Sequence, residues 1–115
     1  MILTVRPIIR WPGVLTMHGH RRMAASPGTY HSTLIMLDRE LVALDATSVV
    51  LQLSIDQSGV TLDDRSSATL KPRHPGVLLS FVSRHGFLLF GTDIFTRWPD
   101  NLRAIAVALE SLRRL

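Results

Sequence analysis

The sequence of 115 residues contains no cysteine, which excludes disulfide bonds, thiolate metal ligands and cysteine nucleophiles. It also contains no apolar run that approaches the ~18 residues needed to cross a membrane. The first residues have no basic stretch ahead of an apolar run, so they do not resemble a secretory signal. We therefore expect a cytoplasmic protein with no membrane partner.

Acidic residues are missing from the first third of the chain. None occurs before Asp38, whereas Arg6, Arg10, Arg21 and Arg22 do, so residues 1–37 carry the whole formal net charge of +4. Nine basic residues balance nine acidic ones in the remainder. Nearly all basic residues are arginine, which suits two-point contacts to phosphate or carboxylate, although a GC-rich genome produces the same bias.

Length and composition predict one folded domain. A chain of this length buries roughly two-thirds of the surface that it exposes when unfolded. Hydrophobic residues make up 46% and charged residues 19%, values typical of globular proteins rather than disordered chains. We expect a single α+β domain over residues 1–115, with a long basic loop at about 10–31.

The first half of the chain predicts a strand, this loop and a helix. Residues 2–6 form a short strand that Pro7 ends or confines to a sheet edge. The stretch from 10 to about 31 has no periodicity, which is typical of a functional loop or a disordered one. Ser32 or Thr33 can cap a helix that runs to about Asp45. Its apolar face recurs at spacings of three and four residues, at Leu34, Leu37, Leu41 and Leu44.

Four strands and a second helix are expected next. Apolar and polar residues alternate over 48–56, with Val49, Leu51, Leu53 and Ile55 on one face. The short run 60–62 is expected to return beside it as a hairpin. Residues 77–84 and 87–90 predict a second hairpin with a loop of His85 and Gly86. If Arg84 pairs with Phe87, then Val82 faces Leu89 and Phe81 faces Phe90.

The last segment predicts a helix with Thr96 or Trp98 near its cap and Pro99 in its first turn. Its apolar stripe consists of Leu102, Ile105, Leu109 and Leu112. The predicted order is therefore β-(long loop)-α-β-β-β-β-α. We expect a mainly antiparallel sheet, mixed if the first strand joins it, with two helices packed on one face.

No catalytic or metal site is expected. Ser83, His85 and Asp93 lie close in sequence, but a histidine at a hairpin tip lacks the buried carboxylate that must orient it. His18 and His20 have metal-ligand spacing and His31 is a third candidate, yet no carboxylate lies in that segment to support a site. We expect no cofactor and no enzymatic activity.

The basic loop is the best candidate for a binding site. Its arginines can contact anionic groups while Trp11 stacks on a base or anchors a protein contact. The candidate residues for a partner or for phosphate groups are Arg10, Trp11, His18, His20, Arg21 and Arg22. No basic helix or nucleic-acid motif accompanies them.

Several segments, among them "RPIIRWPG", "STLIMLDRELVAL", "KPRHPGVLLSFVSRHGFLLFGTDIF" and "NLRAIAVALESLR", resemble the N-terminal region of uncharacterised actinobacterial and actinophage proteins. Those proteins are often described as J-domain-like (DnaJ-like). The resemblance spans nearly the whole chain and implies an accessory domain in a phage or mobile element. This sequence ends where the C-terminal part of those proteins would begin, and it has no His-Pro-Asp motif.

These observations predict a non-enzymatic interaction module that binds a macromolecular partner through the 10–31 loop. An adaptor, an inhibitor or a subunit of a nucleoprotein complex would each fit. Direct binding of DNA or RNA by the arginines of the loop is the alternative, and a metal-dependent enzyme is a further one.

Overall fold

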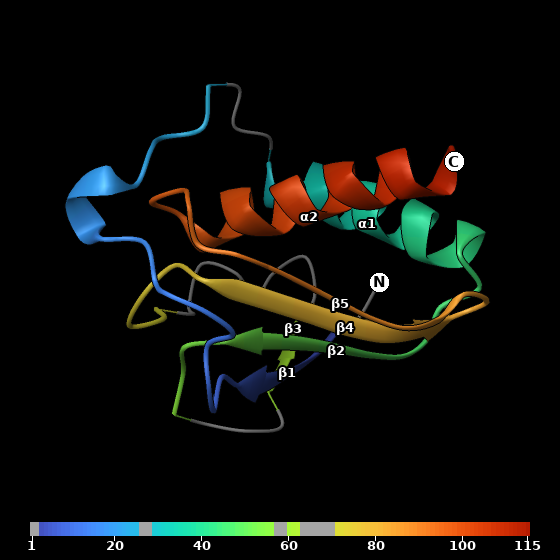
Figure 1. The fold of residues 1–115 in the computed structure, drawn as a ribbon, viewed down its shortest axis with the longest axis horizontal. Helices are drawn as coiled ribbons and strands as arrows, with labels where there is room; N and C mark the ends of the chain where they lie inside the picture. The colour runs from blue at the N-terminus through green and yellow to red at the C-terminus, as the bar shows by residue number, and fades with distance from the viewer. Residues whose placement is uncertain (1–2, 26–28, 57–59, 63–70) are drawn as a thin grey trace.

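The computed structural model describes residues 3–25, 29–56, 60–62 and 71–115 (Figure 1). Both helices lie on the same side of the sheet. Among the described residues, no helix has the length and apolar character needed to cross a membrane. The elements in chain order are β1 (Leu3–Pro7), the 3₁₀ helix η1 (His18–His20), α1 (Tyr30–Ala43), β2 (Thr47–Leu53), β3 (Val60–Leu62), β4 (Val77–Ser83), β5 (Gly86–Thr92) and α2 (Trp98–Arg113).

The strands form one mixed sheet in the order β3-β1-β2-β4-β5. β1 runs parallel to β2, and the other neighbouring pairs are antiparallel. The prediction of an α+β fold with a mixed sheet and two helices is confirmed. The predicted hairpin between the 48–56 strand and residues 60–62 is wrong, because β2 has β1 and β4 as its neighbours. β3 pairs instead with β1, so that Val60 lies opposite Val5.

The β4–β5 hairpin exists, but its loop lies one residue earlier than predicted. Ser83 lies opposite Gly86 and Val82 opposite Phe87, so the turn consists of Arg84 and His85. Gly86 follows the turn with a φ of 99°, an angle that glycine adopts freely and that fits a two-residue turn followed by a bulge. The Ser83 hydroxyl closes the turn by accepting from the His85 N–H at 3.0 Å and donating to the Gly86 carbonyl at 3.1 Å.

The predicted contact between Phe81 and Phe90 is present through a different register. Phe81 lies opposite Leu88, and Phe90 lies opposite Leu79. The two aromatic rings therefore meet diagonally, with centroids 6.2 Å apart and planes 8° from parallel. Diagonal neighbours on one face are within reach of aromatic side chains.

α1 begins one turn earlier than predicted, because its cap is Thr29 rather than Ser32 or Thr33. The Thr29 hydroxyl accepts a hydrogen bond from the Ser32 N–H at 3.0 Å. The helix ends in a turn where the Asp45 N–H donates to the Val42 carbonyl and the Ala46 N–H to the Leu41 carbonyl. These are the two bonds of a Schellman motif, in which Asp45 takes the left-handed position with a φ of 55°.

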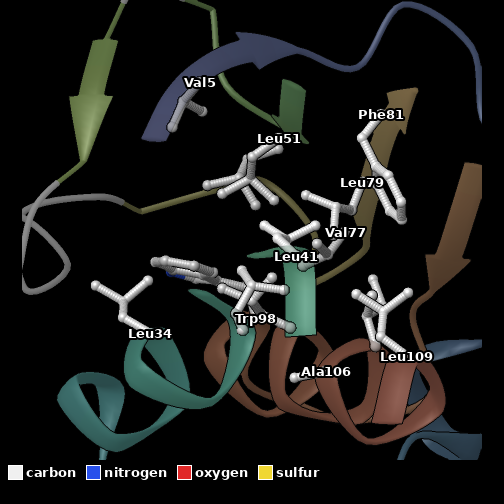
Figure 2. Packing of buried hydrophobic residues seen from close by; sticks show 14 of the residues in the cluster. Val5, Leu34, Leu41, Leu51, Val77, Leu79, Phe81, Trp98, Ala106 and Leu109 are labelled. Carbon is white, nitrogen blue, oxygen red and sulfur yellow. The ribbon is translucent and has the colours of Figure 1, made fainter. Parts of the chain in front are cut away.

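The core lies between the sheet and the two helices (Figure 2). All four leucines of the predicted α1 stripe are buried, and so are Leu102, Ile105 and Leu109 of α2, whereas Leu112 is partly buried. Burying one such side chain stabilises the fold by about 1.5–3 kcal/mol. The strands contribute Val5, Leu51, Leu53, Val77, Leu79 and Phe81 to the same cluster.

An ion pair with a buried carboxylate joins the two helices. Glu40 of α1 is fully buried and accepts hydrogen bonds from Arg113 of α2, from Nε at 2.5 Å and from a terminal nitrogen at 3.2 Å. The Arg113 bond is the main reason that the pKa of Glu40 lies below its ordinary value, against the opposing effect of burial. This pair fixes the C-terminal half of α2 against α1.

Candidate functional site

A buried carboxylate attaches the basic loop to the end of β5. Asp93 accepts hydrogen bonds from the Thr16 N–H at 2.6 Å and from the Thr16 hydroxyl at 2.7 Å. Arg21 adds an ion pair to the same carboxylate at 3.5 Å, and its Nε donates to the Asp93 carbonyl at 2.9 Å. The loop around η1 is therefore held at the end of the sheet where α2 begins (Figure 1).

Backbone pairing continues this attachment. The Arg22 N–H donates to the Ile94 carbonyl at 2.8 Å, and the Thr96 N–H donates to the Arg22 carbonyl at 2.9 Å. Arg22 thus forms an isolated parallel bridge with Phe95. The main chain of the loop runs beside the connection from β5 to α2, and this places His18 and Arg21 next to Trp98.

A pocket of about 420 Å³ lies where these segments meet. Among the described residues, its wall carries three arginine and two histidine side chains and no carboxylate. A concave volume of this size suits a small group or a single side chain of a partner. The pocket is lined by His18, Arg21, Pro72, Arg73, His74, Pro75, Thr96, Arg97, Trp98 and Pro99.

Asn101 holds the opposite wall of the pocket. This fully buried side chain donates to the Pro75 carbonyl at 2.8 Å and to the Phe95 carbonyl at 3.1 Å, and it accepts from the Phe95 N–H at 3.0 Å. One amide on α2 therefore fixes the segment before β4 and the segment after β5. Hydrogen bonds therefore hold the backbone of both segments in place beside the pocket.

Trp11 contacts one of the residues that line the pocket. Its ring meets the ring of His74 edge to face, with centroids 5.9 Å apart. A Cβ atom at Gly76 would lie 2.8 Å from the Trp11 ring and 2.9 Å from the His74 ring, so only glycine allows this approach. The N–H of Gly76 also donates to His74 Nδ1 at 3.1 Å. These contacts fix the orientation of the imidazole.

The arginines that line the pocket differ in whether a carboxylate pairs with them. Burial raises the pKa of Asp93, but the bonds from Thr16 and the charge of Arg21 outweigh it, so that this pKa lies below its ordinary value. Asp93 thereby balances the charge of Arg21. Arg73 pairs with Asp56 at the surface. Among the described residues no carboxylate pairs with Arg97.

The surroundings of His74 favour its neutral form. Burial is the main cause that lowers the pKa of His74 below its ordinary value of 6.5, and the positive charge of Arg21 lowers it further. The carboxylate of Asp93 acts in the opposite direction and only partly offsets them. Protonation of His74 would therefore add a positive charge to the pocket below pH 6.5.

Only some of the predicted binding residues meet at the pocket. His18 and Arg21 line it, and Trp11 supports it through His74. Arg10, His20 and Arg22 have exposed side chains and do not line it. Arg22 acts instead through its backbone in the bridge to Phe95.

Arg73, His74 and Arg97 line the pocket but were not among the residues predicted from the sequence, although a repeated triplet marks them. An arginine, an aromatic or imidazole residue and a proline follow one another at 10–12, 73–75 and 97–99. The middle residues of these triplets are Trp11, His74 and Trp98, and they gather at this single site. His74 contacts Trp11, and His74 and Trp98 both line the pocket.

The residues considered for catalysis and for metal binding are not assembled into such sites. The exposed His85 lies at the hairpin tip, whereas Asp93 follows the other end of β5 and is bonded to Thr16 and Arg21. Ser83 is engaged in the turn. Within the part of the chain that the structure describes, no three or more histidine, cysteine or acidic residues form a group able to hold a metal ion.

No family model, no curated protein and no solved structure matches this chain. The resemblance to J-domain-like actinobacterial proteins therefore stays a prediction, and the pocket is the feature of the structure that bears on function.

Proposed function

We propose that this chain is a non-enzymatic binding module that receives an acidic side chain of a protein partner in the pocket between the basic loop and the start of α2. The single observation that carries the proposal is a concave site that the triplets 73–75 and 97–99 line and that Trp11 of the third triplet supports through His74, with no lining carboxylate among the described residues. Arginine and tryptophan are the residues that most often dominate the energy of protein interfaces.

The form of the site favours a single anionic group. Pro72, Pro75 and Pro99 stiffen the rim, and Asn101 ties two of its walls together. A rigid pocket loses little conformational entropy when it is filled. Arg97 lies at the rim without a paired carboxylate among the described residues, so it can donate charge-assisted hydrogen bonds to an incoming carboxylate.

Binding of nucleic acid is the second candidate. The observation that favours it is the position of Arg10 and Arg22, whose exposed side chains extend the positive charge beyond the pocket. A phosphate in the pocket and neighbouring phosphates on these arginines would give binding that weakens steeply with salt. The two candidates differ in which residues beyond the pocket contribute.

Fluorescence anisotropy with two labelled probes separates them. A short oligoglutamate peptide represents the acidic segment, and a short single-stranded oligothymidine represents nucleic acid. Arg97→Ala should weaken binding of the peptide roughly tenfold, the effect of losing one charge-assisted hydrogen bond. Arg114→Ala removes the same charge from the exposed C-terminal end of α2 and should leave the affinity unchanged.

Three results would count against the proposal: no binding of the peptide, equal losses in the two variants, or tight binding of the oligonucleotide alone. In the last case, Arg10→Ala and Arg22→Ala should each lower the slope of log K against log salt, and the second candidate would replace the first. Retained affinity of Arg114→Ala beside a loss in Arg97→Ala supports the acidic partner.

A further inference from the structure

β5 leaves a long strand edge without a partner in the described part of the chain. It is the last strand of the sheet, and β4 is its only neighbour there. Natural sheets protect their edges with short strands, charges, proline or a covering segment. The opposite edge follows this rule because β3 has 3 residues. β5 has 7 residues and contains neither a charged residue nor proline.

The side chains beside this edge are uncharged and mostly apolar on both faces of the sheet. On the face turned away from the helices, Val82, Phe87 and Leu89 are 42%, 67% and 48% exposed, and Val82 lies directly opposite Phe87. On the helix face, a groove of about 250 Å³ separates β5 from α2. It is lined by Phe90, Gly91, Thr92, Ala104, Ile105 and Ala108, none of which is charged.

The free edge ends where β5 ends. Beyond Thr92, the main chain of Arg22 pairs with the segment around Phe95, and Thr16 is bonded to Asp93. An added strand therefore has access to the length of β5 and to little more. Alternate residues of an edge strand direct their N–H and C=O groups outward, so these groups are available for a further ladder.

We propose that β5 pairs antiparallel with β5 of a second copy of this chain, about a two-fold axis at Leu89. A two-fold axis perpendicular to the sheet keeps each side chain on its own face, so directly opposed residues must share a face. Leu89 then lies opposite Leu89 of the other copy, Leu88 opposite Phe90, and Phe87 opposite Gly91. Within each copy Leu78 lies opposite Gly91 and fills the space where a Cβ atom would be, so Gly91 presents no side chain that would obstruct Phe87 of the other copy.

The distribution of charge allows two copies to meet at β5. The chain carries a formal net charge of +4, so two copies repel one another over much of their surface. β5 and the residues that line its groove carry no charge, and there this repulsion is least. On the helix side, the small side chains of Ala104 and Ala108 allow the two α2 helices to approach across the same axis.

Sedimentation velocity of the full chain from micromolar to millimolar concentration tests the proposal. We expect a monomer–dimer equilibrium. Leu89→Lys places a charge at the axis and should give a monomer at every concentration. Val42→Lys introduces the same residue on α1, where Val42 is 69% exposed, and should dimerise as the unaltered chain does. Circular dichroism verifies that both variants are folded.

Cross-linking tests the register, because the chain has no cysteine of its own. Leu89→Cys brings two thiols together at the axis and should form a covalent dimer on mild oxidation, whereas Val42→Cys should not. A monomer at all concentrations overturns the proposal. Binding of an extended apolar peptide at β5 by that monomer would not rescue it. Dimerisation of Leu89→Lys with unchanged affinity, or equal cross-linking of both cysteine variants, overturns it as well.

Discussion

Asp93 accepts hydrogen bonds from both the N–H and the hydroxyl of Thr16, although 77 positions separate the two residues. Together with the ion pair to Arg21, these bonds make one carboxylate the main attachment of the basic loop to the sheet. A loop with few apolar contacts depends on such bonds for its order. The position of His18 and Arg21 in the pocket thus depends on Asp93.

Asp93→Asn should release the loop and lower the stability of the fold. An amide cannot accept both Thr16 bonds and balance the Arg21 charge, so buried groups lose their partners at a cost of about 1–3 kcal/mol. Hydrogen exchange of the amides of Thr16 and Arg22 should accelerate. Urea unfolding measures the loss of stability, and exchange mass spectrometry locates it.

The acid dependence of stability provides the control. Because the pKa of Asp93 in the fold lies below its ordinary value of 3.8, its contribution is complete above that pH and is lost as the pH falls through the lowered value. Asp93→Asn should therefore lose less stability than the unaltered chain on acidification. Glu40, whose pKa is also lowered, should maintain part of the acid dependence in both. Identical acid profiles would contradict the assigned role of Asp93.

The cap of α1 gives a second prediction. Thr29→Ala removes the hydroxyl that accepts from the Ser32 N–H and should cost about 1 kcal/mol of unfolding free energy. Ser32→Ala leaves this acceptor in place and should cost less. Thermal unfolding of both variants decides between the observed start of the helix and the start predicted from sequence. A larger loss for Ser32→Ala would indicate that the helix begins at the later position.

Local patterns predicted the helices and the alternation of β2, because each pattern is complete within one element. The leucines of α1 recur on one face, and Leu51 and Leu53 are buried as their alternation required. Strand partners depend on the whole sheet and are not encoded in this way. The turn signal before Val60 suggested a hairpin, yet β1 already occupies that side of β2.

The residues of the pocket could be predicted only in part, because they come from segments that are brought together by the whole fold. Arg21 and His18 belong to the N-terminal segment, whose lack of acidic residues indicates a binding surface. Arg73 and Arg97 lie in the part of the chain where basic and acidic residues are equal in number. The repeated Arg-aromatic-Pro triplet links them, but nothing local indicates that the three copies meet. They meet because residues 71–76 and the start of α2 are bonded through Asn101, and because Asp93 holds the loop beside them.

The end of α1 gives a third prediction. Asp45 has a φ of 55°, a region that costs a residue with a Cβ about 1–2 kcal/mol relative to the right-handed helix, with less for aspartate. Asp45→Gly should therefore raise the unfolding free energy by about 0.5–1 kcal/mol. The ion pair of Asp45 with Arg84 joins two exposed side chains at 3.4 Å, and its loss costs little.

Asp45→Ala is the matched control because it removes the same carboxylate and retains a Cβ. It should be less stable than Asp45→Gly in urea unfolding. Equal stability of the two variants would show that the backbone angle at this position contributes nothing.

Because the neutral form of His74 is favoured in the free pocket, we expect binding of an anion to strengthen in mild acid. Its pKa lies below 6.5, chiefly because it is buried, so the free pocket gains this charge only as the pH falls below that value. A bound carboxylate favours the protonated form of His74 and therefore raises its pKa. Affinity for the oligoglutamate probe should therefore rise severalfold between pH 7.5 and 5.5, as measured by anisotropy. The same burial means that His74 stabilises the fold above pH 6.5 and loses this contribution as the pH falls.

His74→Asn tests this dependence while preserving an acceptor for the Gly76 N–H, which now bonds to His74 Nδ1. The variant should bind the probe with a flatter pH profile, and its affinity at pH 7.5 should change little because His74 carries no charge there. His20→Asn removes an exposed imidazole that does not line the pocket and should keep the original profile. If His74→Asn keeps the full rise in affinity, the proton that strengthens binding enters elsewhere, and the pocket does not respond to pH through His74.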